Sequence, residues 1–284
     1  MPVSKLTPQE IVDSIGELPP MPTAISDVIN ACDDQDMTVG QLSQIVLKDQ
    51  SLTANILKLA NSAFYGHARR VTTVTEAVVL LGFSAIKSLA ISSHTARLLN
   101  RSLPGYGLPA GQLWHQSMCV AFTARRIAVE VQLAPVEEAF VAGLLHDIGK
   151  VILSSHLEAA FNEVQQLAMD RQMPFHHIEA EILGFDHAEL GARIAAKWSF
   201  PPELEEAIRC HHDPEQATLK PLLPHVVHLA DSACMMLGQG IGSDGLAYEV
   251  CPSTLEALEF TPERMMELMD DIAPMLAADS FGIE

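Results

Sequence analysis

Apolar residues recur along most of this chain at the spacing of an α-helix, whereas the sustained strict alternation that marks β-strands is hard to find. Helix-start signals agree with that periodicity. A Thr-Pro-Gln-Glu sequence at 7–10 places a capping residue, a proline and a glutamate in the order typical of a helix N-terminus. Thr38 with Gln41, and Asp186 with Glu189, repeat the arrangement. The pattern therefore predicts an all-α protein.

The same periodicity divides the chain into helices and breaks. The strongest break is Ser-Leu-Pro-Gly-Tyr-Gly-Leu-Pro at 102–109, and a second loop from Gly238 to Asp244 precedes an acidic tail. We expect an N-terminal helical part over 1–105, a helical core over 106–240 and a helical tail over 241–284. The predicted helices cover 7–16, 22–33, 38–47, 51–63, 75–81, 84–99, 110–131, 135–147, 150–171, 176–183, 187–198, 202–211 and 221–237, with one or more short helices between 253 and 278.

Composition narrows the class of protein. The 284 residues include 17 Lys and Arg against 36 Asp and Glu, which gives a formal net charge of −19. Because a protein that binds nucleic acid needs a positive surface to neutralise phosphates, this balance argues against a nucleic-acid partner. A hydrophobic content of 48% is ample for a core, which argues against global disorder.

Cysteine usage and the lack of long apolar runs indicate the cellular compartment. The five cysteines are widely spread and contain no C-x-x-C pair, which argues against a disulfide framework or a thiolate zinc site. The first residues lack the basic start and apolar stretch of a secretory signal. No apolar run approaches the roughly 18 residues that suggest a membrane span. We therefore expect a cytoplasmic protein without a membrane partner.

Histidine supplies the candidate chemistry, since the chain has 12 of them. The sharpest local signal is Gly-Leu-Leu-His-Asp-Ile-Gly-Lys at 143–150, an apolar helix that ends in a His-Asp doublet before a glycine. Consecutive helical residues point about 100° apart, so His146 and Asp147 diverge. That divergence suits an imidazole that holds one metal ion and a carboxylate that reaches between two. Lys150, one turn on, could contact an anionic substrate oxygen or pair with a carboxylate.

Further candidate ligands accompany the doublet. His115 lies early in a long predicted helix, His187 follows the Asp186 cap, His211 and His212 end another helix, and Asp231 interrupts an apolar helical run. Together these side chains form a plausible nitrogen and oxygen cage for metal ions. The alternative is a hydrogen-bonded network without metal.

Other histidines have more ordinary explanations. His176 and His177 open a predicted helix, where surface or capping duty is favoured over a place in the site. His228 is three residues from Asp231, so it could support that ligand from behind or simply pack in the core.

The ordered pattern H…HD…H…HH…D resembles the HD superfamily of metal-dependent phosphohydrolases, which includes the HD-GYP cyclic-di-GMP phosphodiesterases. Within that superfamily the chain is similar to HDOD proteins, which carry the HD-related output domain of bacterial signalling. The narrower resemblance extends over about 15–235. It is carried by Leu-Pro-Pro-Met-Pro at 18–22, Leu-Ala-Asn-Ser-Ala-Phe-Tyr-Gly at 59–66, 75–83, Asp-His-Ala-Glu-Leu-Gly at 186–191, Trp-Ser-Phe-Pro at 198–201 and Ala-Ile-Arg-Cys-His-His at 207–212.

The resemblance implies an HD-domain-like helical bundle with an N-terminal helical subdomain and a site that holds two divalent ions of Fe, Mn, Ni or Zn. Asp147 and Lys150 would be the catalytic residues, with Lys150 contacting the substrate. Gly111 stands where some HD-GYP enzymes have a ligating glutamate, which argues against a third metal ion or a complete ligand set. The Gly-Tyr-Pro loop is missing after the His-His pair, which argues against cyclic-di-GMP hydrolysis. The implied metal ligands are His115, His146, Asp147, His187, His211, His212 and Asp231.

These features lead to a preferred hypothesis and its alternatives. The preferred one is a bacterial cytoplasmic regulatory protein of HDOD type, with a metal-binding HD site, a nucleotide or other phosphorylated small molecule as ligand, and a signalling protein as partner. The second is an active metal-dependent phosphohydrolase on a nucleotide or phosphoester. The third is a metal-free interaction scaffold with a relict site. The retained ligands argue against the third.

Overall fold

The computed structural model describes Asp13, Leu18 and residues 20–65, 69–158, 161–171, 173–239 and 250–277. Within these ranges the chain is built from helices, and its pairing of extended backbone is limited to one isolated bridge between Leu103 and Leu108. The predicted all-α class is therefore confirmed. The described helices include none that is long and apolar enough to cross a membrane.

Contacts group the described residues into two compact units. Leu18 with 99–272 makes the larger unit, and 20–98 with 273–277 makes the smaller one. The predicted division at 105/106 and 240/241 stays a prediction. The smaller unit contains α2 (Thr23–Asp33), α3 (Val39–Val46), α4 (Gln50–Ala60), η2 (Ala63–Tyr65), α5 (Val74–Leu81) and nearly all of α6 (Phe83–Leu99).

The larger unit carries the histidine-rich sequence. Its elements are η3 (Pro104–Tyr106), α7 (Gln112–Glu130), α8 (Val136–Leu145), α9 (Lys150–Leu157), α10 (Phe161–Arg171), α11 (Phe175–Leu183), α12 (His187–Lys197), α13 (Pro202–Arg209), η5 (Pro214–Gln216), α14 (Leu222–Met236), α15 (Pro252–Ala257) and most of α16 (Pro262–Ala277).

The predicted helix over 150–171 is wrong, because α9 and α10 are separate helices. Their buried apolar residues continue one helical period, from Leu153 and Leu157 to Val164 and Ala168, so the pattern gave no sign of the break. The helix predicted over 7–16 lies outside the described residues, apart from Asp13.

Two predicted helix starts have side-chain caps. Thr38 and Gln41 form the complete capping box at the start of α3. At α12 the Asp186 side chain accepts a hydrogen bond from the Glu189 backbone, but the Glu189 side chain pairs with Arg193 instead of closing the box. The Asp186 cap is sufficient to fix where α12 begins, directly before His187.

The smaller unit is a helical cluster with its own core. Val28, Leu42, Ile56 and Leu59 from α2, α3 and α4 are completely buried. At the end of α4, the Asn61 side chain bonds the backbone of Val71 in both directions, which holds the chain in place ahead of α5. The Asn61 side chain therefore serves local structure.

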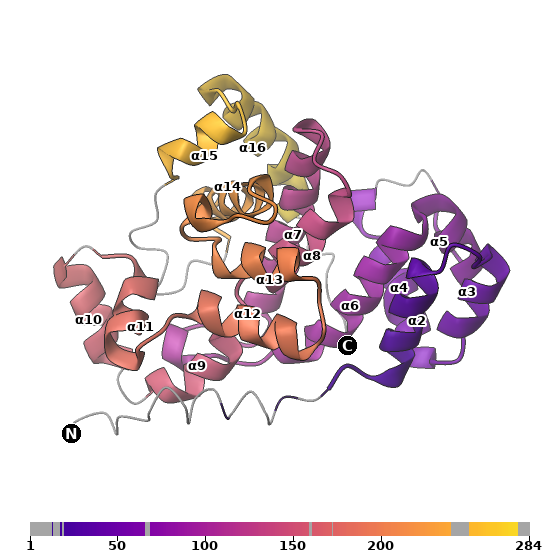
Figure 1. Ribbon diagram of the computed structural model, residues 1–284, viewed down its shortest axis with the longest axis horizontal. Coiled ribbons are helices and arrows are strands. Elements are labelled where there is room, and N and C mark those ends of the chain that lie inside the picture. The colour runs from indigo at the N-terminus through magenta and orange to yellow at the C-terminus, as the bar shows by residue number, and fades with distance from the viewer. Residues whose placement is uncertain are drawn as a thin grey trace. The chain divides into compact units, whose positions relative to one another are not determined.

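In the larger unit, α7 packs against α8 and α14, and α13 contacts α12, α8 and α14. Figure 1 shows α14 between α13 and α15. A side chain on Gly143 would lie 3.0 Å from the Ala121 Cα, so this glycine allows α8 to approach α7 closely.

A second glycine contact brings the ends of two helices together. A Cβ on Gly149 would lie only 2.0 Å from the His187 carbonyl oxygen. The start of α9 can therefore contact the start of α12 only because Gly149 has no side chain. This packing places Asp147 and Lys150 beside His187.

Candidate metal centre

The His146 side chain is fixed on one edge and has an open nitrogen on the other. It lies in the turn after α8, where Nδ1 donates to the Gly143 carbonyl at 2.7 Å. Its Nε2 is buried without a well-formed hydrogen bond, although Asp147 Oδ2 lies 3.3 Å away and Asp231 Oδ1 lies 3.4 Å away. When the ring is neutral, with its one proton on Nδ1, the Nε2 lone pair is directed between two carboxylates.

Asp147 is the central carboxylate of the site. Its Oδ1 lies 3.1 Å from His187 Nε2, and its Oδ2 accepts from Lys150 Nζ at 2.7 Å. Both side chains of the Asp147–Lys150 pair are almost completely buried. The two oxygens of one carboxylate thus face different groups, with His146 on one side and His187 on the other.

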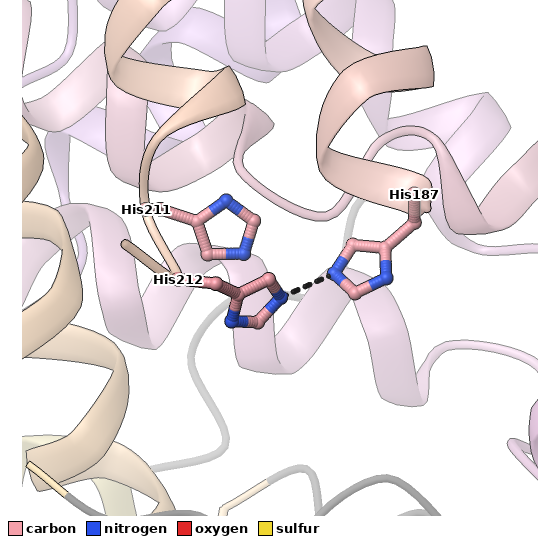
Figure 2. A group of neighbouring side chains, drawn as sticks. All are labelled: His187, His211 and His212. Carbon is pink, nitrogen blue, oxygen red and sulfur yellow. Dashed lines mark hydrogen bonds between the residues drawn. The ribbon is translucent and has the colours of Figure 1, made fainter. Parts of the chain in front are cut away.

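Three histidines, one from the start of α12 and two from the turn after α13, gather in one cluster (Figure 2). The Nε2 atoms of His187 and His212 are 2.9 Å apart, and nitrogen atoms of His187, His211 and His212 all lie within 4.8 Å of one another. His211 donates from Nδ1 to the Ile208 carbonyl at 2.7 Å, and its Nε2 is buried without a hydrogen-bond partner among the described residues.

Helix α14 supplies Asp231 and a supporting histidine. His228 donates from Nδ1 to the His211 carbonyl at 2.8 Å and accepts at Nε2 from the Cys251 amide at 3.0 Å. Both ring nitrogens therefore bind backbone groups. His228 thus supports the backbone of a candidate ligand, His211, rather than the Asp231 side chain that the sequence suggested.

The α7 side chain that lines the site is Gln116. Its Nε2 lies 3.5 Å from Asp231 Oδ1. His115 is half-buried, with Nδ1 3.6 Å from Cys119 Sγ, and is not among the residues that line the cavity. The other predicted ligands come together around Asp147, whereas the assignment of His115 stays a prediction.

Charge in the site is balanced internally. Burial opposes the charged form of both His146 and His187, but Asp147 beside His146 and Glu179 beside His187 more than offset it and raise the pKa of each to about 10. Burial instead lowers the pKa of His211 and His212 well below the usual value, with the neighbouring imidazoles adding to the effect. Binding a cation at His146 and His187 would release their protons.

Glu179 is a member of the site that the sequence reasoning missed. This carboxylate is fully buried on α11 and bonds His187 and Tyr106. A signal was present in the sequence, because Phe175, Ile178 and Leu183 define the buried face of α11 and Glu179 lies on that face. An acidic residue at such a position needs a partner, which points to a polar site.

The cavity at the centre is narrow, with a volume of about 20 Å³. That is room for roughly one water-sized particle. The His176 ring stacks on His212 with centroids 4.0 Å apart and planes 6° from parallel, so this histidine belongs to the cavity wall. The wall also includes Gln116, Asp147, Lys150, Phe175, His187, His212, Asp231 and Met235.

The donor set fits a divalent cation. Two atoms that each bind one ion at about 2.1 Å, with an angle of about 90–110° between them, are about 3.0–3.4 Å apart. The pairs that His146 Nε2 makes with Asp147 and Asp231 (3.3 and 3.4 Å) and that His187 Nε2 makes with Asp147 and His212 (3.1 and 2.9 Å) lie in or next to that range. The strongest sign that a cation fits is that, among the described residues, the buried Nε2 atoms of His146 and His211 have no well-formed hydrogen bond.

Comparison with known proteins identifies the family of this chain. The family model of the HDOD domain matches residues 18–214. The chain belongs to the HDOD domain family. The matched region includes every candidate ligand described above except Asp231, which follows on α14.

Individual relatives of this HDOD protein are distant in sequence, but the similarity to each extends over most of this chain. A protein of Treponema pallidum (strain Nichols), described only as uncharacterized, is 27% identical over 221 residues, which are 76% of this chain. The match spans 42% of that longer relative. An HDOD domain protein of unknown function from Geobacter sulfurreducens has a crystal structure that is 26% identical, with a TM-score of 0.73 over 96% of this chain and 88% of its own.

The name of a second similar crystal structure refers to an enzymatic activity. It is a candidate phosphohydrolase from Shewanella amazonensis SB2B, 25% identical, with a TM-score of 0.64. The similarity covers 93% of this chain and 98% of that one. The multi-helix HDOD bundle is thus shared along nearly the whole of both chains.

Proposed function

We propose that this chain is a bacterial regulatory HDOD protein whose HD site binds divalent metal. The observation that carries the proposal is the pair of buried imidazoles, His146 and His211, each with Nδ1 bound to a carbonyl and Nε2 left open toward the cluster. A buried polar atom normally has a partner. A cation held by these nitrogens and the carboxylates of Asp147 and Asp231 would supply one.

The arrangement around Asp147 supports two ions rather than one. Oδ2 of this carboxylate faces His146, which also neighbours Asp231, and Oδ1 faces His187, which also neighbours His212. Each group offers nitrogen and oxygen donors, which suit Fe, Mn, Ni or Zn. When bound, such ions act as Lewis acids toward a phosphoryl group.

Access to the cluster favours regulation over turnover. His146, Asp147 and His187 are at most 1% exposed, and the cavity of about 20 Å³ is far below the 300–1,000 Å³ of sites that enclose a small-molecule ligand. A nucleotide or other phosphorylated molecule would have to displace the wall that includes Phe175 and His176. The proposed output is therefore a change of conformation on ligand or metal binding, passed to a signalling partner.

A phosphohydrolase is the second candidate, and Lys150 favours it. Its ammonium group lines the cavity next to Asp147, where it could meet an anionic oxygen of a substrate. The name of the Shewanella amazonensis structure points the same way. Turnover would require that Lys150 leave Asp147, which a metal ion at that carboxylate would promote.

Metal analysis tests the proposal directly. Protein purified without chelator should contain divalent metal, and metal-free protein should bind added Mn²⁺ or Zn²⁺ in a calorimetric titration. His212→Gln should weaken that binding, because it removes a donor 2.9 Å from His187 Nε2. Asp170→Asn, an exposed carboxylate on α10, is the matched control that should bind as the wild type does.

The outcomes separate the hypotheses. A wild-type protein that binds no divalent metal would contradict the proposed function. Stoichiometric metal without turnover on a panel of nucleotides and phosphoesters would support the regulatory role. Metal-dependent turnover that Lys150→Met abolishes would favour the phosphohydrolase.

A further inference from the structure

A single buried carboxylate, that of Glu179, holds both the ring and the backbone of His187. Its Oε2 accepts from His187 Nδ1 at 2.7 Å and from the His187 backbone N–H at 2.8 Å. Its Oε1 accepts from the Tyr106 hydroxyl at 2.6 Å. Glu179 is completely buried, so these three donors take the place of water.

The two contacts with His187 do different things. His187 is the first residue of α12, and its backbone N–H is one of the donors that a helix leaves unsatisfied at its start. The Glu179 carboxylate satisfies it and so ties α11 to the beginning of α12. The second contact keeps the proton on Nδ1, which leaves Nε2 as the nitrogen that faces Asp147 and His212.

Tyr106 fixes the carboxylate from the other side. It comes from η3 in the Pro-Gly segment between α6 and α7 and is completely buried, with its ring 5.4 Å from that of Phe175. A Cβ on Gly105 would lie 2.3 Å from the Ser154 carbonyl oxygen, so η3 is pressed directly against α9. Lys150 Nζ lies 5.6 Å from the centre of the Tyr106 ring. The segment that interrupts the helical pattern is thus part of the support of the site.

We propose that Glu179, held in place by Tyr106, is a positioning residue that presents His187 Nε2 to the metal. The inference rests on the proposed metal-binding function, and it assigns a role to two residues outside the ligand set. Partners behind a metal-bound histidine typically contribute about 10- to 100-fold to metal affinity. Glu179 should contribute in that range.

Zinc binding to the full-length metal-free protein tests the assignment. Glu179→Ala should weaken Zn²⁺ binding by about 10- to 100-fold. Glu179→Gln should lose less, because its amide oxygen can still accept from His187 while its NH₂ group faces a Tyr106 hydroxyl able to rotate and accept. Glu181→Gln, two residues on and paired with Arg171 at the surface, is the matched control with wild-type affinity.

A spectroscopic readout separates positioning from general destabilisation. In the zinc-loaded wild type, ¹H–¹⁵N correlation spectra of labelled histidine should show His187 with its proton on Nδ1, protected from solvent exchange. Glu179→Ala should lose that protection while His146 and His211, which are bound to carbonyls, keep theirs. A loss shared equally by all three rings would indicate a structural effect and overturn the assignment.

The test remains decisive if one variant fails. Should Glu179→Ala not fold, Tyr106→Phe removes only the hydroxyl that anchors the carboxylate, and an affinity for Zn²⁺ equal to that of the wild type would overturn the proposal. If Glu179→Ala folds and binds Zn²⁺ as tightly as the wild type, the positioning role is wrong and metal binding stands. If the wild type itself binds no zinc or manganese, the proposed function fails, and this inference with it.

Discussion

Lys150 and Asp147 make the most consequential pair of the site at the scale of single residues. Both are buried, and their charged groups are 2.7 Å apart. A pair of this kind adds little over well-packed apolar residues, but the loss of one partner leaves a buried charge without compensation. Lys150 therefore matters for stability even if it never touches a substrate.

Lys150→Met should destabilise the metal-free protein by up to about 3–5 kcal/mol, because the Asp147 carboxylate loses its closest cation and keeps only the imidazoles of His146 and His187 beside it. Added Zn²⁺ should recover much of this loss by supplying positive charge at the same carboxylate. Urea unfolding with and without Zn²⁺ measures both effects. Lys87→Met, which removes an exposed pair with Asp33, is the control and should cost about 1 kcal/mol or less. Equal losses in the two variants would contradict the argument.

Gly149 is the other residue with a specific structural task. Gly149→Ala should destabilise the protein by at least about 1–3 kcal/mol, since its Cβ would lie 2.0 Å from the His187 carbonyl oxygen and force the starts of α9 and α12 apart. It should also weaken metal binding, because His187 moves. Gly40→Ala, on the exposed side of α3 with no atom within 4 Å of the new Cβ, should be neutral or slightly stabilising in the same thermal unfolding experiment.

At the scale of elements, α13 ends just before the two histidines, and Glu206 holds this helix to the chain that follows them. This carboxylate accepts from the Thr218 backbone and hydroxyl and from the Leu219 backbone. Burial acts to raise its pKa, but these hydrogen bonds to the anion outweigh it and hold the pKa of Glu206 below the ordinary value. The segment after His212 is thereby fixed to α13.

The stabilising contribution of Glu206 should depend on pH in a definite direction. Because the folded-state pKa is lowered, the contribution is fully present above the ordinary glutamate pKa and is lost as pH falls through the lowered folded value. The free energy of unfolding should therefore differ most between wild type and Glu206→Gln near neutral pH, and the difference should shrink in acid. Glu203→Gln, exposed on the same helix, should show a smaller difference. A gap that widens toward low pH would be incompatible with this explanation.

Local signals account for the parts of the site that the sequence predicted. The His-Asp doublet, the capped start at His187 and the His-His helix end are each visible within a few residues, and the structure brings these side chains around Asp147. Glu179 and Tyr106 are 73 positions apart and meet only through packing, so no local pattern connects them. The break between α9 and α10 could not be predicted either, because the period of buried apolar residues continues from one helix to the next.

At the scale of the whole molecule, the candidate ligands all belong to the unit formed by Leu18 and 99–272. A ligand stabilises what it binds, by about 2.7 kcal/mol when its concentration is 100 times its Kd. Metal should therefore raise the unfolding temperature of that unit, and excess chelator should reverse the rise.

Hydrogen exchange can locate this effect along the chain. Zn²⁺ should increase amide protection in α12, in α14 and in the turn after α13, which carry His187, Asp231 and the His211–His212 pair, more than in α2 to α5, which carry none of the candidate ligands. The His212→Gln variant serves as the comparison, with a smaller increase. Protection that rises only in α2 to α5 would place the metal elsewhere.

The narrow cavity described above also affects how fast metal could exchange. An ion held beside His146, Asp147 and His187, which are at most 1% exposed, would leave past a wall that includes His176 and Phe175, so movement of that wall should affect how fast metal exchanges. Such a site keeps the ion it acquired first and answers slowly to the ions around it. The protein would then carry a record of the metals present when it folded, rather than a reading of those present at the moment.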